Sequence, residues 1–158
     1  MTTSTITEQF AADHDRLDAL FTDFQSLKRK DPAAAKEKFK AFLKGLTRHI
    51  VWEEDVLFPV FEKRTGMKDF GPTAVMRQEH RQIKGHLDAI HDKVRAADPN
   101  SDAAENALLD VLKAHNMKEE QMLYPAIDQG LDAAGLDAAR KAMDAIPEER
   151  YACCCGAH

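Results

Sequence analysis

Cysteine is absent from the first 152 residues of this 158-residue chain, and all three cysteines stand together at Cys153, Cys154 and Cys155. Adjacent cysteines pair only through a strained ring, so the chain lacks the spaced framework of a disulfide-stapled secreted domain. The start of the sequence also lacks the charged and then apolar pattern of a signal peptide. These absences favour a reducing compartment, and we expect a cytoplasmic protein.

Long apolar runs and basic clusters are missing as well. No uninterrupted apolar stretch approaches the roughly 18 residues that a membrane-spanning helix needs, so no membrane association is expected. The 22 basic side chains are outnumbered by 27 acidic ones, which gives a formal net charge of -5. No lysine and arginine stripe suited to phosphate contacts is present, so nucleic acid is not expected as a partner.

Apolar residues recur at steps of three and four, the pattern of amphipathic helices. Together with cap residues and prolines, the pattern predicts helices at about 6–29, 32–64, 72–97, 102–129 and, shorter than the rest, 136–146. Short connections favour an all-α fold, an up-down-up-down four-helix bundle with a short extra C-terminal helix. We assign residues 1–147 to this single domain and residues 148–158 to a Cys-rich tail.

Two local features of the predicted helices need explanation. About 15 helical residues follow His49, but only about 8 precede His80. Either the second helix overhangs its neighbour, or the segment 65–71 climbs back along it. Pro59 and Pro125 lie inside helical patterns, where each removes a backbone donor and is expected to kink the last turns.

The chain also contains an internal duplication with a shift of 66 residues. The shift aligns His14 with His80, His49 with His115, Glu53 with Glu119, Leu57 with Leu123, and Pro59 with Pro125. The histidines and glutamates occupy inner positions of the helical stripes, where apolar residues otherwise stand. Residues four apart share a helix face, so each His-x-x-x-Glu pair directs an imidazole and a carboxylate into one space.

Four imidazoles and two carboxylates from four helices form a ligand set for two metal ions. The set suits iron, manganese or zinc, and its lack of cysteine removes the strongest indicator of structural zinc. The alternative is a polar core network without metal, in which each buried charge would lose several kcal/mol of hydration. One such pair would be weak support, but two matched pairs are specific. The predicted ligands are His14, His49, Glu53, His80, His115 and Glu119.

The pattern of a lone histidine, then His-x-x-x-Glu, repeated over residues 6–129, resembles the hemerythrin-like family. This resemblance implies a four-helix bundle with a non-heme di-iron centre, often with an oxo or hydroxo bridge, that handles dioxygen, nitric oxide, peroxide or iron itself. Oxygen-carrying members have a fifth histidine where this chain has Lys84. The set of four histidines and two glutamates looks more like iron-centre repair proteins and the F-box iron-sensing subunit, and it predicts a more open iron.

We therefore expect a di-iron protein whose four histidines are terminal ligands and whose glutamates bridge the ions. The expected task is binding or reducing a small oxidant, namely dioxygen, nitric oxide or peroxide. The alternative is an iron-handling or iron-centre repair protein, acting as donor or sensor with the same site. The sequence leaves open whether the chain is an enzyme, a carrier or a sensor, and whether it has a protein partner.

Several residues beside the predicted ligands have two interpretations. Glu54 and Glu120 could touch metal, although acidic residues at such positions are more often solvated. Tyr124 could reach an open coordination position or donate a proton, although its counterpart Phe58 favours a packing role. The three cysteines of the tail are either part of a frayed terminus or a thiol cluster for redox exchange or iron relay.

Overall fold

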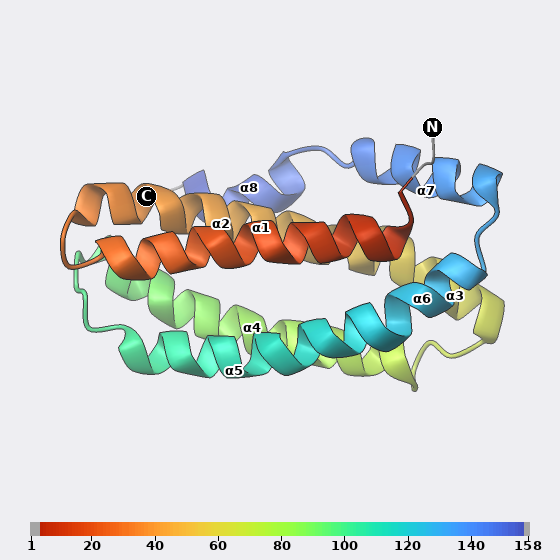
Figure 1. Cartoon of the computed structure of the whole chain (residues 1–158), viewed down its shortest axis with the longest axis horizontal. Helices are drawn as coiled ribbons and strands as arrows, with labels where there is room; N and C mark the ends of the chain where they lie inside the picture. The colour runs from red at the N-terminus through yellow and green to blue at the C-terminus, as the bar shows by residue number, and fades with distance from the viewer. Residues whose placement is uncertain (1–3, 157–158) are drawn as a thin grey trace.

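A computed structural model describes the backbone of residues 4–156 and the side chains of residues 4–152. Every regular element among these residues is a helix, and four long rods dominate the molecule (Figure 1). The first two rods are α1 (Ile6–Leu27) and α2 (Pro32–Trp52), which continues through the π-helical turn η1 (Glu53–Leu57) into α3 (Phe58–Thr65). The others are α4 (Pro72–Arg95) and α5 (Asp102–Lys118), which continues through η2 (Glu119–Leu123) into α6 (Tyr124–Gln129). Two shorter helices follow, α7 (Ala133–Asp144) and α8 (Glu149–Gly156).

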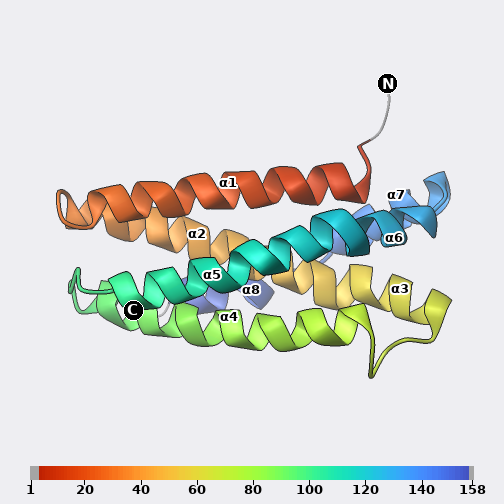
Figure 2. The ribbon, with the colours of Figure 1, turned by 60° about the horizontal axis from the view of Figure 1, so that its bottom comes forward.

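The chain reverses direction at each connection between rods, so the all-α bundle expected from the sequence is confirmed (Figures 1 and 2). Figure 2 also shows how the middle connection is made. The end of α3 projects past the start of α4, and the segment 66–71 runs back to it. Both solutions that the residue spacing had left open are therefore used together.

Helix ends follow largely from local side chains. Thr5 and Glu8 form a reciprocal capping box at the start of α1, and Asp31 caps α2 ahead of a proline at its first position. The carboxylate of Asp128 at the end of α6 accepts the Ile6 and Thr7 backbone N–H groups at 2.9 and 3.0 Å. A carboxylate at this end also suits the positive pole of the helix dipole, so α1 is tied to the fourth rod.

The C-terminal region differs from the sequence-based expectation. The fifth predicted helix begins earlier, at Ala133, because Asp132 accepts the Gly135 N–H and caps it there. A further helix, α8, occupies most of the predicted tail and packs against α2. The backbone of Cys153–Cys155 belongs to α8, but the side chains of these cysteines lie outside the described part. None of the helices described is long and apolar enough to cross a membrane.

The core has two apolar clusters at different levels along the bundle. One contains buried residues of α1, α2, α4 and α5, among them Phe21, Phe42 and Ile83. The other contains residues of α1, α3, α4, α6 and α7, among them Phe10 and Phe58. The histidines and glutamates predicted as ligands belong to neither cluster, and they form a polar layer between them.

Candidate metal centre

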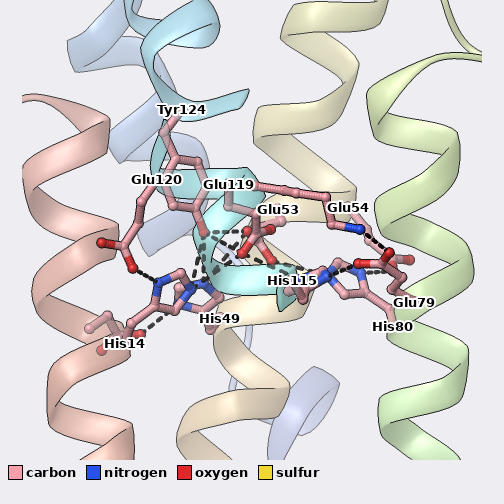
Figure 3. Close-up of polar contacts among 12 residues, drawn as sticks. His14, His49, Glu53, Glu54, Glu79, His80, His115, Glu119, Glu120 and Tyr124 are labelled. Carbon is pink, nitrogen blue, oxygen red and sulfur yellow. Dashed lines mark hydrogen bonds and ion pairs between the residues drawn. The ribbon is translucent and has the colours of Figure 1, made fainter. Parts of the chain in front are cut away.

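All six predicted ligands lie in this polar layer. No more than 4% of the surface of any of them is exposed: His14, His49, Glu53, His80, His115 and Glu119. Their donor atoms form two overlapping groups, within each of which all atoms lie within 4.8 Å of one another. One group holds His14 and His49, the other His80 and His115 (Figure 3). Each group thus takes its two histidines from one helical hairpin, and the duplication relates one group to the other.

The two glutamates lie between the pairs of histidines. Glu53 Oε2 is 3.5 Å from His49 Nε2, and Glu53 Oε1 is 3.3 Å from His80 Nε2. Glu119 Oε1 is 3.3 Å from both His14 Nε2 and His115 Nε2. Each carboxylate therefore faces one imidazole from each helical hairpin, which is the arrangement that a bridging ligand requires.

A wide turn follows each His-x-x-x-Glu segment. The Phe58 N–H bonds to the Glu53 carbonyl and the Tyr124 N–H to the Glu119 carbonyl, five residues back in each case. Prolines stand immediately after these donors and lack the N–H that an α-helix would use. The duplicated prolines are thus accommodated by π turns, whose hydrogen bonds span one residue more than those of an α-helix and which recur at functional sites.

Each of the four histidines is held from behind by a carboxylate. The Nδ1 atoms of His14, His49, His80 and His115 lie 2.5–2.9 Å from oxygens of Glu120, Asp13, Glu54 and Glu79, respectively. With Nδ1–H donated to a carboxylate, each Nε2 presents its lone pair to the centre of the layer. Carboxylates that orient metal-binding histidines in this way also raise their basicity.

The sequence had pointed to only half of these supporting carboxylates. Glu54 and Glu120, each of which follows a predicted ligand in the sequence, lie behind His80 and His14. Asp13 and Glu79 were missed, because each stands beside one histidine in the sequence yet bonds to the histidine of the adjacent helix. The 66-residue shift could have found them, since it aligns Asp13 with Glu79.

The charges in the layer are strongly coupled. Burial alone would lower the pKa of His49, but Glu53 and Asp13 outweigh burial and raise this pKa to about 10. Burial is likewise outweighed at His80, where Glu53 and Glu54 raise the pKa to about 9. At Glu53 burial is opposed by His49, which holds the carboxyl pKa well below its usual range. The layer therefore attracts positive charge, as protons or as metal ions.

Tyr124 reaches into the same layer. Its hydroxyl oxygen lies 2.6 Å from Glu53 Oε2, 2.9 Å from Glu119 Oε1 and 3.1 Å from His49 Nε2, with His14 Nε2 at 3.4 Å. Burial, with Glu53 and Glu119 beside it, raises the pKa of the phenol well above its usual value. The ring packs in the apolar cluster beside Phe10, as its counterpart Phe58 suggests, and the hydroxyl group in addition takes part in the polar layer.

The donors present fit a metal centre. Three of their atoms, Glu53 Oε1, Glu119 Oε2 and His80 Nε2, are fully buried without a hydrogen-bond partner. Buried polar atoms are nearly always partnered, and coordination to a metal ion would satisfy all three. Imidazole and carboxylate donors suit iron, manganese or zinc.

Comparison with known proteins agrees with this chemistry. A family model described as Hemerythrin HHE cation binding domain matches residues 5–127. The chain belongs to this hemerythrin HHE family. The family implies a bound metal, typically iron, and a di-iron type of protein. No solved structure gives a significant match.

Curated relatives of this hemerythrin-type chain carry different names. A Nostoc protein named DNA nickase is 30% identical over 121 residues, which are 77% of this chain and 33% of that protein. The iron-sulfur cluster repair protein YtfE of Yersinia pestis is 27% identical over 108 residues, which are 63% of this chain and 49% of YtfE. The same protein of Yersinia pseudotuberculosis matches equally. The chain spans half or less of the length of these relatives.

Two grooves lead from the surface of the hemerythrin-type bundle to the layer. The groove between α1 and α5, of about 570 Å³, reaches His14 and is acidic, with Asp15, Asp18 and Glu120. The groove between α2 and α4, of about 260 Å³, reaches His80, and its exposed surface is largely apolar. Leu43, Ile50, Val51 and Leu87 line it together with the charged side chains of Glu54, Arg81, Lys84 and Asp88. Lys84 lines this second groove and pairs with Asp88 at 3.2 Å. The layer thus has an acidic approach and an apolar approach.

Proposed function

We propose that the chain holds two iron ions in the polar layer and binds or reduces a small oxidant there. His14 and His49 would bind one ion, His80 and His115 the other. The observation that carries the proposal is the position of Glu53 and Glu119, whose carboxylates each face imidazoles of both pairs. One metal ion would need only one of these pairs.

The protein's own residues would set the conditions for this chemistry. Iron supplies the capacity to bind and transfer electrons to dioxygen, nitric oxide or peroxide. Asp13, Glu54, Glu79 and Glu120 fix the imidazoles through their Nδ1 atoms, so the Nε2 lone pairs are already oriented. The apolar clusters on both sides close the two ends of the layer to bulk water. The small, apolar groove at His80 suits a small neutral oxidant.

Use of the site for reaction rather than for reversible storage is supported by its ligand count. Lys84 stands where oxygen-carrying members have a fifth histidine, and its ammonium group is paired with Asp88 on the surface. Lys84 therefore does not replace the missing histidine as a ligand of the ion at His80. An ion with fewer protein donors keeps a position for an exogenous ligand.

Metal analysis and spectroscopy of the purified, iron-loaded chain test the proposal. We expect about two irons per chain, a Mössbauer spectrum of a coupled ferric pair, and rapid spectral change on stopped-flow mixing of the reduced protein with one of the three oxidants. Glu119→Ala should bind fewer than two irons, whereas His86→Asn, outside the layer on α4, should bind as the wild type does. One zinc per chain without iron uptake would contradict the proposal.

A second candidate is iron handling or repair of iron centres. It is supported by the relatives named iron-sulfur cluster repair protein and by the acidic groove that reaches His14, a suitable route for a cation. Transfer of iron from the loaded chain to a cluster-depleted ferredoxin would distinguish it from oxidant chemistry. Cys153→Ser, Cys154→Ser and Cys155→Ser together should slow transfer without changing the iron spectrum if the cysteines relay iron.

A further inference from the structure

The two halves of the polar layer differ at one pair of aligned residues. The 66-residue shift that aligns every predicted ligand also aligns Tyr124 with Phe58. Both rings are fully buried. Only Tyr124 carries an oxygen, and this oxygen lies on the side of His14 and His49. Phe58 instead stacks on His80, with ring centroids 5.7 Å apart and an angle of 9° between the planes.

The phenol oxygen occupies the position of a ligand rather than a place behind one. Donors bound to one ion at about 2.1 Å are separated by about 3.0–3.4 Å, depending on the coordination angle. The Tyr124 oxygen is 2.6–3.4 Å from four such donors, two of them the Nε2 atoms of His14 and His49. Its distances to the His49 and His14 Nε2 atoms, 3.1 and 3.4 Å, are those of donors that share one ion. Glu119 offers an oxygen to the same group, in which the atoms of His14, His49 and Glu119 lie within 4.8 Å of one another.

Hydrogen bonding alone cannot satisfy this arrangement in the metal-binding form of the histidines. Each histidine donates its Nδ1–H to a carboxylate, so its Nε2 atom is an acceptor. The phenol has a single proton, yet it faces two imidazole acceptors and two carboxylates (Figure 3). A cation bound by His14, His49 and the phenol oxygen would satisfy these lone pairs with one positive charge.

We propose that Tyr124 is a seventh protein ligand, whose phenolate oxygen binds the ion held by His14 and His49. Coordination replaces the phenol O–H bond by an oxygen–iron bond, and the proton leaves to water. The ion held by His80 and His115 has Phe58 at the equivalent place and keeps the open position, which the apolar groove between α2 and α4 reaches. This inference rests on the proposed di-iron function and assigns the oxidant to one of its two ions.

Resonance Raman spectroscopy of the ferric protein tests the ligand directly. The chain has only two tyrosines, Tyr124 and Tyr151. We expect phenolate vibrations that shift when the wild type is grown with ring-deuterated tyrosine. They should disappear with their visible charge-transfer band in Tyr124→Phe and persist in the matched control Tyr151→Phe.

The outcomes separate the inference from the function on which it rests. A wild type that binds two irons without phenolate vibrations overturns the role of Tyr124 and leaves the di-iron proposal intact. A wild type that binds no iron removes both. The labelled wild type decides the matter even if Tyr124→Phe does not fold.

Azide titration tests which ion is open. The ferric wild type should bind one azide per iron pair. Phe58→Tyr places a phenol at the open position and should weaken azide binding at least tenfold, whereas Phe58→Leu, which adds no oxygen, should leave it within about threefold. Equal azide affinity of Phe58→Tyr and Phe58→Leu would show that the open position lies elsewhere.

Discussion

Replacement of Glu79 by Gln tests how the carboxylates behind the histidines support metal binding. Glu79 Oε1 lies 2.9 Å from His115 Nδ1, and only 17% of the side chain is exposed. Glutamine keeps the size and an acceptor oxygen but removes the charge. A hydrogen bond to a charged group contributes about 1.5–3 kcal/mol, against about 0.5–1.5 kcal/mol for a neutral one. The midpoints of these ranges differ by about 1.25 kcal/mol, which corresponds to a loss of affinity close to tenfold, at the lower end of the roughly 10–100-fold losses known for such partners.

Competition between the metal-free protein and a ferrous chelator, without oxygen, measures this loss. Glu79→Gln should weaken one of the two binding steps about tenfold, and Asp13→Asn, its counterpart behind His49, should weaken the other. Glu37→Gln is the matched control, because the Glu37 side chain is 74% exposed and pairs with Lys40 on the surface rather than with a residue of the layer. Thermal unfolding of the metal-free variants would reveal any loss of fold. Affinity of Glu79→Gln equal to that of Glu37→Gln would refute the supporting role.

Three further predictions concern stability. Lys28→Met should lower the free energy of unfolding, measured in urea, by about 3–5 kcal/mol, because the buried Glu105 carboxylate, 2.5 Å from the Lys28 ammonium, loses its cation. The double variant Lys28→Met with Glu105→Leu should recover most of this loss. A double variant as unstable as the single one would contradict this explanation. Asp128→Ala should cost about 1–2 kcal/mol by releasing the start of α1, seen as a melting temperature lower by several degrees; an unchanged temperature would argue against the anchor. The pKa values of His49 and His80 are higher in the fold than in the unfolded chain, so protonation of these residues stabilises the metal-free fold. This stabilisation is complete below pH 6.5 and is lost as the pH rises through about 9 for His80 and about 10 for His49. The urea midpoint of the metal-free protein should therefore fall between pH 6.5 and about 10, whereas that of the iron-loaded protein should not. If the midpoints of both forms fell in parallel with pH, protonation of the two histidines would not explain the loss of stability.

The bundle and the composition of its polar layer could be predicted because both leave periodic signals. Apolar steps of three and four define the rods, and the duplication marks His49 and Glu53 by their likeness to His115 and Glu119. Such signals depend only on which residues share a helix face. They require no knowledge of how neighbouring helices cross.

The rest depends on geometry that an α-helical period does not describe. At about 100° per residue, Tyr124 stands on the face opposite His115, nine positions earlier. The π turn at η2 adds a residue and returns the phenol to the inner face. Asp13 bonds across a helix pair, so its partner depends on the packing of α1 against α2. Helix α8 passes through three cysteines, which carry no helical signature of their own.

The division of the apolar core has a consequence for how this protein can evolve. Each cluster includes side chains from every one of the four rods, so each end of the bundle is closed independently of the histidines and glutamates. Substitutions in the intervening layer then alter reactivity while the scaffold above and below persists. A domain organised in this way can acquire a new ligand in the layer by a point substitution, and the proposed role of Tyr124 depends on one such position, where the first half has Phe58.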